Sequence, residues 1–448
     1  MRLTTTTLRD DSATLHSKLY TRYVTILLTL VYVFNQLDRR VFDILMEPIR
    51  LTFSLTDAQL GFLGGPALVV LYSLLGVPVA RWADRSGRIT LMTVAITLWS
   101  AIATLTATVG QFWQLALVRV GVGVGEAGFS AVAVSVIGDY ESDKNRTRAL
   151  ANFALAIPIA SLLSDLMGGW INQLYGWRWV FMIAGPPGIL LALLMRATVR
   201  DPPRREASGS ESQSRPPLRL ILSTLWRRRS LRHLAIAQGL ANIVVNVMGW
   251  ISVFFIRQHH MGTGELGSWF AFTDGVGGIA GIWLGGALAT SFGGTDARVR
   301  ARLMAYASVL VAPLVVFILW CPSKTAALLG CLLLNIPMLF YVGPTTGLVQ
   351  DLVGANMRAT MASIFFLIQM LAGGVIGTQL VGTLSDTLTP VTASSAVALR
   401  WSMTLGAMVT FWAAFHYWRA ARYVQEDLST APGGTIADHP IERADIPV

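Results

Sequence analysis

The chain has 448 residues, of which 53% are hydrophobic and only 13% are charged, about half of the charged share of soluble domains. This composition cannot cover the polar surface that a soluble protein of this length needs, so soluble, disordered and collagen-like proteins are excluded. Two cysteines exclude a disulfide framework and a cysteine-rich metal site, and His and carboxylate residues show no metal-ligand spacing, so we expect neither metal nor cofactor.

The hydropathy pattern predicts an all-α membrane protein with twelve transmembrane helices, because about 20 mainly apolar residues cross the ~30 Å hydrocarbon layer. The first group of six is expected at 22–46, 57–82, 89–109, 111–140, 146–174 and 176–197. The second group is expected at 231–257, 265–292, 300–320, 323–352, 357–386 and 397–420. No small-residue cleavage site accompanies the first apolar run, so we expect no removable signal peptide.

The polar segments divide the chain into two six-helix bundles, expected at 22–197 and 231–420. The remaining segments are an N-terminal tail, a linker rich in Pro, Ser and Arg, and a C-terminal tail, at 1–21, 198–230 and 421–448. Segment 80–88 aligns with 286–294 at an offset of 206 residues. This similarity indicates two pseudo-symmetric halves in the same orientation, as in transporters whose site lies between the halves.

Basic residues predict the orientation in the membrane. With a cytoplasmic N-terminus, 27 of the 35 Lys and Arg residues fall in inner segments and only five in outer loops. We therefore expect a multi-pass protein of the inner (plasma) membrane, monomeric, with both termini in the cytoplasm. Basic loops that face anionic headgroups also explain the net charge of +10, so nucleic-acid binding is not expected.

Four short stretches resemble a known family. Asp84, Arg85, Gly87 and Arg88 match motif A of the major facilitator superfamily, although Ala80 stands where the motif has its first Gly. Within that superfamily, three stretches are similar to spinster-type transporters. They are Asn35-Gln-Leu-Asp38-Arg39, the segment from Glu47-Pro-Ile-Arg50 to Gly61, and Arg119-Val-Gly-Val-Gly-Val-Gly-Glu126-Ala127. The resemblance covers roughly residues 22–420.

The resemblance implies a secondary active transporter, not an enzyme, that works by alternating access. It also implies an amphiphilic or lipid-like substrate such as a lysophospholipid or a sphingoid phosphate. We expect an anionic substrate of this class, protons and membrane lipids as the partners. A proton-coupled transporter of small organic anions, drugs or sugar acids is the main alternative. A membrane enzyme acting on lipids lacks a visible nucleophile constellation, and a passive channel is disfavoured by the charges within the spans.

Three charged residues within the spans are the candidate proton-coupling site. Asp38 lies eight residues from the outer end of the first span and Arg119 eight from the outer end of the fourth, so both are expected ~12 Å deep and able to meet. Glu126 follows Arg119 by nearly two helical turns and is expected on the same face. Because intramembrane charges are costly unless paired, an arginine between two carboxylates predicts a proton switch.

Polar residues within the spans also supply the expected substrate-binding site. Arg119, Arg39, Asn35 and Glu126 are the expected substrate-binding residues, with Arg39 either a gate residue or a headgroup contact. Arg40 is interpreted as structural or interfacial. Asp165 and Asp274 have no obvious basic partner at matching depth, and their roles stay open.

Motif A predicts a cytoplasmic gate. It places Asp84, Arg85 and Arg88 at the inner end of the second span, and Asp139 ends the fourth span on the same side. We expect these four residues to form a salt-bridge cluster that closes the inner face. The resemblance further implies that Asp84 faces the N-terminus of the eleventh span, whose positive dipole end attracts an anion.

Overall fold

The computed structural model of the protein describes residues 18–430, except for 86, 128, 142, 203–216 and 294–295. Within these ranges the regular elements are helices and none is a strand, which confirms the all-α class. The expected tail positions 1–17 and 431–448 and the middle of the expected linker lie outside the described residues.

The first six spans fold as ten helices because several spans are broken. Proline lacks the backbone N–H that continues a helix, and Pro66 and Pro186 each begin a new helix directly after a glycine. The helices are α1 (Lys18–Phe53), α2 (Asp57–Gly64), α3 (Pro66–Arg85), α4 (Arg88–Leu105), α5 (Phe112–Glu126), α6 (Phe129–Tyr140), α7 (Asp143–Ala154), α8 (Ala156–Tyr175), α9 (Trp177–Ala184) and α10 (Pro186–Thr198), with a 3-10 turn at Thr106–Thr108.

The second half shows similar breaks. A π-helical turn, η5 (Leu371–Gly377), interrupts the eleventh span in a glycine-rich run, and such turns often accompany functional sites. The helices are α12 (Arg229–Val247), α13 (Ile251–His259), α14 (Thr263–Gly293), α15 (Ala297–Trp320), α16 (Lys324–Leu339), α17 (Val342–Asp351), α18 (Arg358–Met370), α19 (Thr378–Thr392), α20 (Ser395–Ala407) and α21 (Val409–Ser429), with 3-10 turns at Met248–Trp250 and Ala355–Met357.

Ten of the twelve expected spans are confirmed as helical segments long and apolar enough to cross a membrane, from Asp57–Gly76 to Arg358–Thr392. The first and twelfth spans are also helical, as α1 and as α20 with α21, but they are more polar. In α1 the apolar run is interrupted by two acidic and two basic residues within 38–43. The sequence analysis missed α11 (Leu218–Arg227), a helix within the expected linker.

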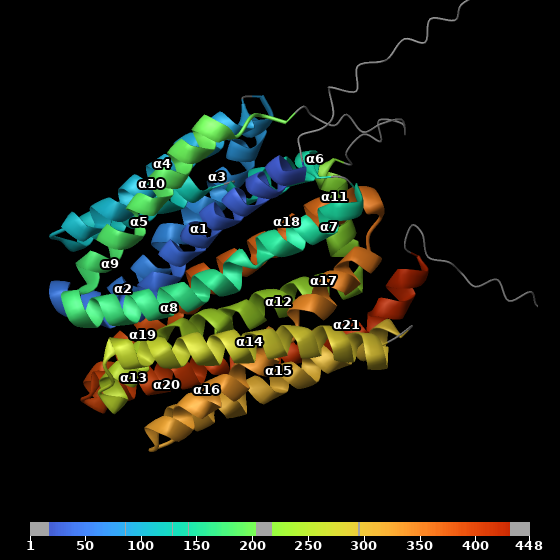
Figure 1. Ribbon diagram of the computed structural model, residues 1–448. Helices are drawn as coiled ribbons and strands as arrows, with labels where there is room; N and C mark the ends of the chain where they lie inside the picture. Colours follow the sequence, from blue (N-terminus) through green and yellow to red (C-terminus); the bar gives the residue numbers. More distant parts are fainter. Residues whose placement is uncertain are drawn as a thin grey trace, which may run out of the picture.

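Buried apolar residues show where the two halves meet. α1–α10 form one bundle and α12–α21 a second beside it (Figure 1). One core, which we call the shared core, takes residues from both bundles, such as Phe42 and Leu60 from the first and Trp250 and Val381 from the second. Two further cores each belong to one bundle, around Trp99 in the first and Tyr417 in the second.

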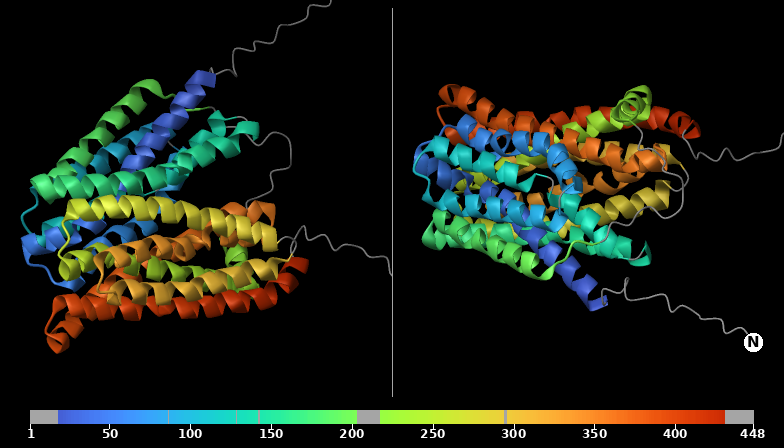
Figure 2. Two further views of the ribbon diagram at one scale, coloured as in Figure 1. Left: turned by 60° about the horizontal axis from the view of Figure 1, so that its bottom comes forward. Right: turned by 90° about the horizontal axis from the view of Figure 1, so that it is seen from above.

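In the part of the chain that the structure describes, the two bundles lie closest together at one end. Figure 2 (left) shows them close together at the end opposite both termini and diverging toward the end that carries the termini. We call the joined end the closed end. There α2 packs against α19, α1 against α13, and α8 against α14.

Glycines allow the backbones to approach closely across this junction. A Cβ added at Gly65 would collide with the carbonyl oxygen of Gly374 in η5 and with the Thr378 hydroxyl. A Cβ at Gly382 of α19 would likewise collide with the Asp57 carbonyl in α2. Small residues at helix interfaces serve this purpose in membrane proteins.

Replacing Gly65 by alanine is expected to separate the bundles at the closed end, because backbone atoms of η5 cannot give way cheaply. Gly76→Ala in α3, the helix that follows Gly65, is the control, since nothing lies within 4 Å of its added Cβ. Spin labels at the exposed positions Leu51 and Val391, in a background with both cysteines replaced by serine, would measure the separation. Longer distances for Gly65→Ala alone are expected, and an unchanged distribution would contradict the role of the close approach.

Candidate functional site

A buried ion pair joins α1 to α5 inside the first bundle. Arg39 Nε donates to Glu126 Oε2 at 2.5 Å, and the Glu126 side chain is fully buried. The Arg39 guanidinium also lies over the Tyr72 ring of α3, 4.1 Å from the ring centroid. The sequence analysis expected Arg119 as the partner of Glu126, so the structure assigns this contact to Arg39 instead.

Polar atoms around this pair lack hydrogen-bond partners. Asn35 Nδ2, Asp38 Oδ2 and Glu126 Oε1 are buried without one, and all three residues are at most 5% exposed. An unpartnered polar atom in a low-dielectric interior is costly. A proton, or water that carries one, would remove this cost at either carboxylate.

Arg119 is almost completely buried, at 1% exposed. Its guanidinium carbon lies 4.2 Å from the centroid of the Phe42 ring, and its Nε donates to the Leu63 carbonyl at 3.3 Å. That carbonyl is available because α2 breaks after Gly64 and leaves its last C=O groups without helical partners. No ion pair joins Arg119 to Asp38 or Glu126 in the described structure, although both carboxylates act on it electrostatically.

Arg119 and Glu126 both belong to α5, seven residues apart, so they lie on nearly the same face of that helix. The partner of Glu126 nevertheless comes from another helix, because the long Arg39 side chain of α1 reaches its carboxylate.

A second polar group lies where α8 of the first bundle packs against α14 of the second. Asp165 Oδ2 has no partner, whereas Asp274 Oδ1 accepts a hydrogen bond from Asn335 Nδ2 at 2.9 Å. Arg40 donates weakly to Ser161 at 3.4 Å and acts electrostatically on both acids. Within the described ranges neither acid forms an ion pair.

Two of the four expected gate residues are joined near the end that carries the termini. Arg88 Nη1 donates to Asp139 Oδ2 at 2.5 Å and to Ser135 at 3.1 Å, and Nη2 donates to the Pro202 carbonyl at 3.1 Å. All of these residues belong to the first bundle or the segment that follows it, so the pair does not bridge the bundles here. The side chains of Asp84 and Arg85 lie outside the described residues.

The most extensive ion-pair network lies at the closed end and bridges the two bundles. Arg257 of α13 donates to Glu47 of α1 and to both carboxylate oxygens of Asp57 in α2, with Nη2 to Glu47 Oε2 at 2.8 Å and to Asp57 Oδ1 at 2.7 Å. These three side chains are only 4–6% exposed. Arg50 completes the group by binding the other Glu47 oxygen at 2.8 Å.

The start of α2 supports the same junction. Asp386 of α19 accepts hydrogen bonds from the backbone N–H groups of Asp57 and Ala58, at 3.0 and 2.8 Å. A carboxylate is favoured there because a helix N-terminus carries free N–H donors and a partial positive charge. Ser385 of the same helix donates to Asp57 Oδ2 at 2.6 Å.

Sequence reasoning missed this closed-end network. It counted Arg50 and Arg257 among the five basic residues of the outer loops, and it quoted Glu47, Arg50 and Asp57 as part of a family-like stretch. The available signal was the density of charged residues in 47–57 next to a lone basic residue at the end of the seventh span. Charge composition alone could not show that they meet across the bundles.

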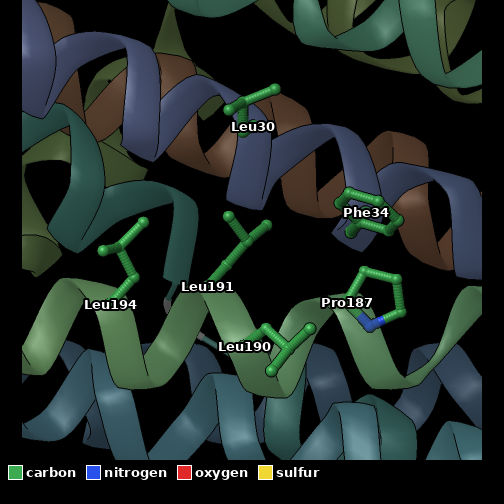
Figure 3. Close-up of a pocket in the computed structure, with 6 residues that line it drawn as sticks. All are labelled: Leu30, Phe34, Pro187, Leu190, Leu191 and Leu194. Atoms are coloured by element: carbon green, nitrogen blue, oxygen red, sulfur yellow. The ribbon is translucent and has the colours of Figure 1, made fainter.

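An apolar groove lies between α1 and α10. Leu30 and Phe34 of α1 face Pro187 and Leu191 of α10 across a space of about 240 Å³ (Figure 3). Leu190 and Leu194 complete the lining, and several of its side chains are exposed at the bundle surface. A groove with this lining fits a hydrocarbon chain rather than a polar group.

Comparisons with known proteins agree with this architecture. The family model described as Major Facilitator Superfamily matches residues 28–378. An MFS-type efflux pump of Mycolicibacterium smegmatis is 28% identical, over 90% of this chain and 94% of that protein. Sphingosine-1-phosphate transporter SPNS2 of Mus musculus is 28% identical over 52% of this chain, and the match spans 43% of that longer protein.

Solved structures match more of the chain. A bacterial homolog of the human lysosomal transporter spinster, in an inward-facing and unoccupied conformation, is 26% identical with a TM-score of 0.85, covering 92% of this chain and 99% of that one. A D-xylose-proton symporter, at 16% identity and a TM-score of 0.71, covers 93% of this chain and all of that one, and it supports the fold alone.

Proposed function

Since this chain belongs to the major facilitator superfamily and is a spinster-like transporter rather than an enzyme, we propose that it moves a lipid-like amphiphile by alternating access, driven by protons. The cargo class is a lysophospholipid or a sphingoid phosphate. The printed name of the mouse relative and the apolar groove between α1 and α10 support this choice. We place both termini in the cytoplasm and the closed end on the outer side, as the basic residues indicate.

The observation that carries the proton coupling is the buried pair of Arg39 with Glu126 beside unpartnered carboxylate oxygens. Arginine keeps its charge, so at this site the proton is gained or lost at a carboxylate, and we assign it to Glu126 or Asp38. When Glu126 is protonated, Arg39 loses its partner and the ion pair that ties α1 to α5 weakens. Protonation thereby changes which arrangement of these helices is stable, and this is the link between proton binding and alternating access.

The substrate-binding role of Arg119, Arg39, Asn35 and Glu126 belongs to the same proposal. A guanidinium can hold a phosphate or carboxylate through two parallel hydrogen bonds. Arg119 has this capacity because it is free of a carboxylate partner in the described structure. Asp84, Arg85, Arg88 and Asp139 are proposed to close the cytoplasmic face in the opposite state, with the pair of Arg88 and Asp139 already formed.

A second candidate is the export of small organic anions or drugs. It is favoured by the mycobacterial efflux pump, which aligns over nearly its whole length. The buried charges serve both candidates equally, so only the cargo separates them.

Proton flux into liposomes that contain the purified protein tests the function. Adding a lysophospholipid or a sphingoid phosphate is expected to start proton movement, whereas a sugar acid is not. Across an alkyl-chain series the affinity is expected to rise by up to about fourfold per buried methylene. Proton flux with an affinity that is flat against chain length would favour the second candidate, and no flux with either cargo class would contradict the proton coupling.

A further inference from the structure

α11 lies across the ends of the bundle helices instead of running along them. In Figure 2 (right) this yellow-green helix is seen nearly end-on, while the bundle helices run across the picture. It lies at the end that carries the termini (Figure 1). Its axis is therefore nearly parallel to the plane of a membrane that the bundle helices cross.

One side of α11 is apolar yet largely exposed, although Arg232 lies over the Trp226 ring. Ile221 is buried against the second bundle, at 2% exposed. Leu218, Leu222 and Trp226 follow at four-residue spacing and form a neighbouring stripe, which is 58%, 45% and 70% exposed respectively. Water contact with three large apolar side chains on one helix is unfavourable, so this stripe needs an apolar neighbour.

The helix is held in this orientation by its C-terminal junction. Arg228 donates to the backbone carbonyls of Leu352, Asp427 and Thr430, which end α17 and α21. Asp427 in turn accepts from the backbone N–H of Ser230 at 2.7 Å and so caps α12. The direction of the apolar stripe is thus fixed by the fold of the second bundle.

Positive charge flanks the stripe. Arg219, Arg227 and Arg229 are exposed, and none of them forms an ion pair within the described residues. α11 itself contains no acidic residue. Leucine and tryptophan on one side with arginine on the other is the composition of helices that lie in the headgroup region of a bilayer.

We infer that α11 docks on the anionic phospholipid surface of the leaflet beside it, with Leu218, Leu222 and Trp226 at the boundary between headgroups and acyl chains and the arginines on the phosphates. Charge complementarity selects this partner, since exposed arginines without an ion-pair partner among the described residues match anionic headgroups, although Arg229 also lies over the Tyr423 ring. The inference is independent of the transported substrate.

Leu220 and Leu222 supply a matched test. Both are leucines of α11 and both are 45% exposed, but they lie on roughly opposite sides of the helix. Each is replaced by a spin-labelled cysteine in the full-length protein with Cys321 and Cys331 changed to serine. The protein is reconstituted into vesicles of phosphatidylcholine alone or of equal parts phosphatidylcholine and phosphatidylglycerol.

In the mixed vesicles the label at 222 is expected to be accessible to oxygen and protected from a water-soluble nickel chelate, and the label at 220 to show the reverse. Replacing Arg219 and Arg227 by glutamine should weaken the docking by about fivefold per arginine and remove its dependence on phosphatidylglycerol. Equal chelate access at both positions would overturn the inference. The inference would also be overturned if the label at 222 were already fully protected from the chelate in detergent, because the label would then contact protein.

Discussion

Replacing Glu126 by glutamine is expected to abolish proton-driven accumulation of substrate while leaving proton-independent exchange largely intact. The amide keeps the size of the side chain but cannot take up a proton. A pH difference of one unit supplies about 1.36 kcal/mol per proton that moves down it. This free energy supports about tenfold accumulation of the substrate for each coupled proton. Uptake or efflux in liposomes with an imposed pH difference should therefore fall to the equilibrium ratio of one, and Asp38→Asn should give the same loss.

Two further variants make this result interpretable. Glu265→Gln is the matched control. It makes the same chemical change at a side chain that is 44% exposed and paired with Lys324, so accumulation should stay unchanged. Glu126→Gln leaves Arg39 as an unpaired charge, so the double variant with Arg39→Gln keeps the site neutral if the single variant folds poorly. Normal accumulation by Glu126→Gln would contradict the proton coupling through this residue.

The spans were predictable because their signal is local. Crossing a membrane requires a fixed length of apolar chain, and the expected boundaries of ten spans lie close to those of the structure. The break at Gly65 was not predicted, although a proline follows it. α11 was missed because a short amphipathic helix in a basic, Ser-rich linker leaves no long apolar run.

The residues of the candidate site could be predicted from the sequence, but the ion pair that they form could not. Asp38, Arg119 and Glu126 are indeed buried, as expected of charges placed within apolar spans. Depth along ideal helices could not show that Arg39 reaches Glu126 from α1. Arg257 was missed for a related reason, since its partners Glu47 and Asp57 come from two other helices, 210 and 200 residues away in the chain.

Replacing Arg257 by glutamine is expected to open the closed end. The substitution leaves Glu47 and Asp57 as buried carboxylates without the cation that they share. Removing one partner of a buried ion pair destabilises the structure by roughly 3–5 kcal/mol. The cost falls on the closed state alone, because water hydrates both acids once the bundles separate there. A shift of this size changes the ratio of the two states by about a hundredfold or more.

The spin-label pair at Leu51 and Val391 would report this shift as a gain in the long-distance population. Arg50→Gln is the matched control, since Arg50 binds Glu47 from the same helix, three residues away, and breaks no contact between the bundles. Arg257→Lys should lie between the two, because an ammonium group keeps the charge but cannot bind both carboxylates in the same forked geometry. If Arg257→Gln and Arg50→Gln gave the same distance distribution, the closed-end network would not be the contact that holds this end of the two bundles together.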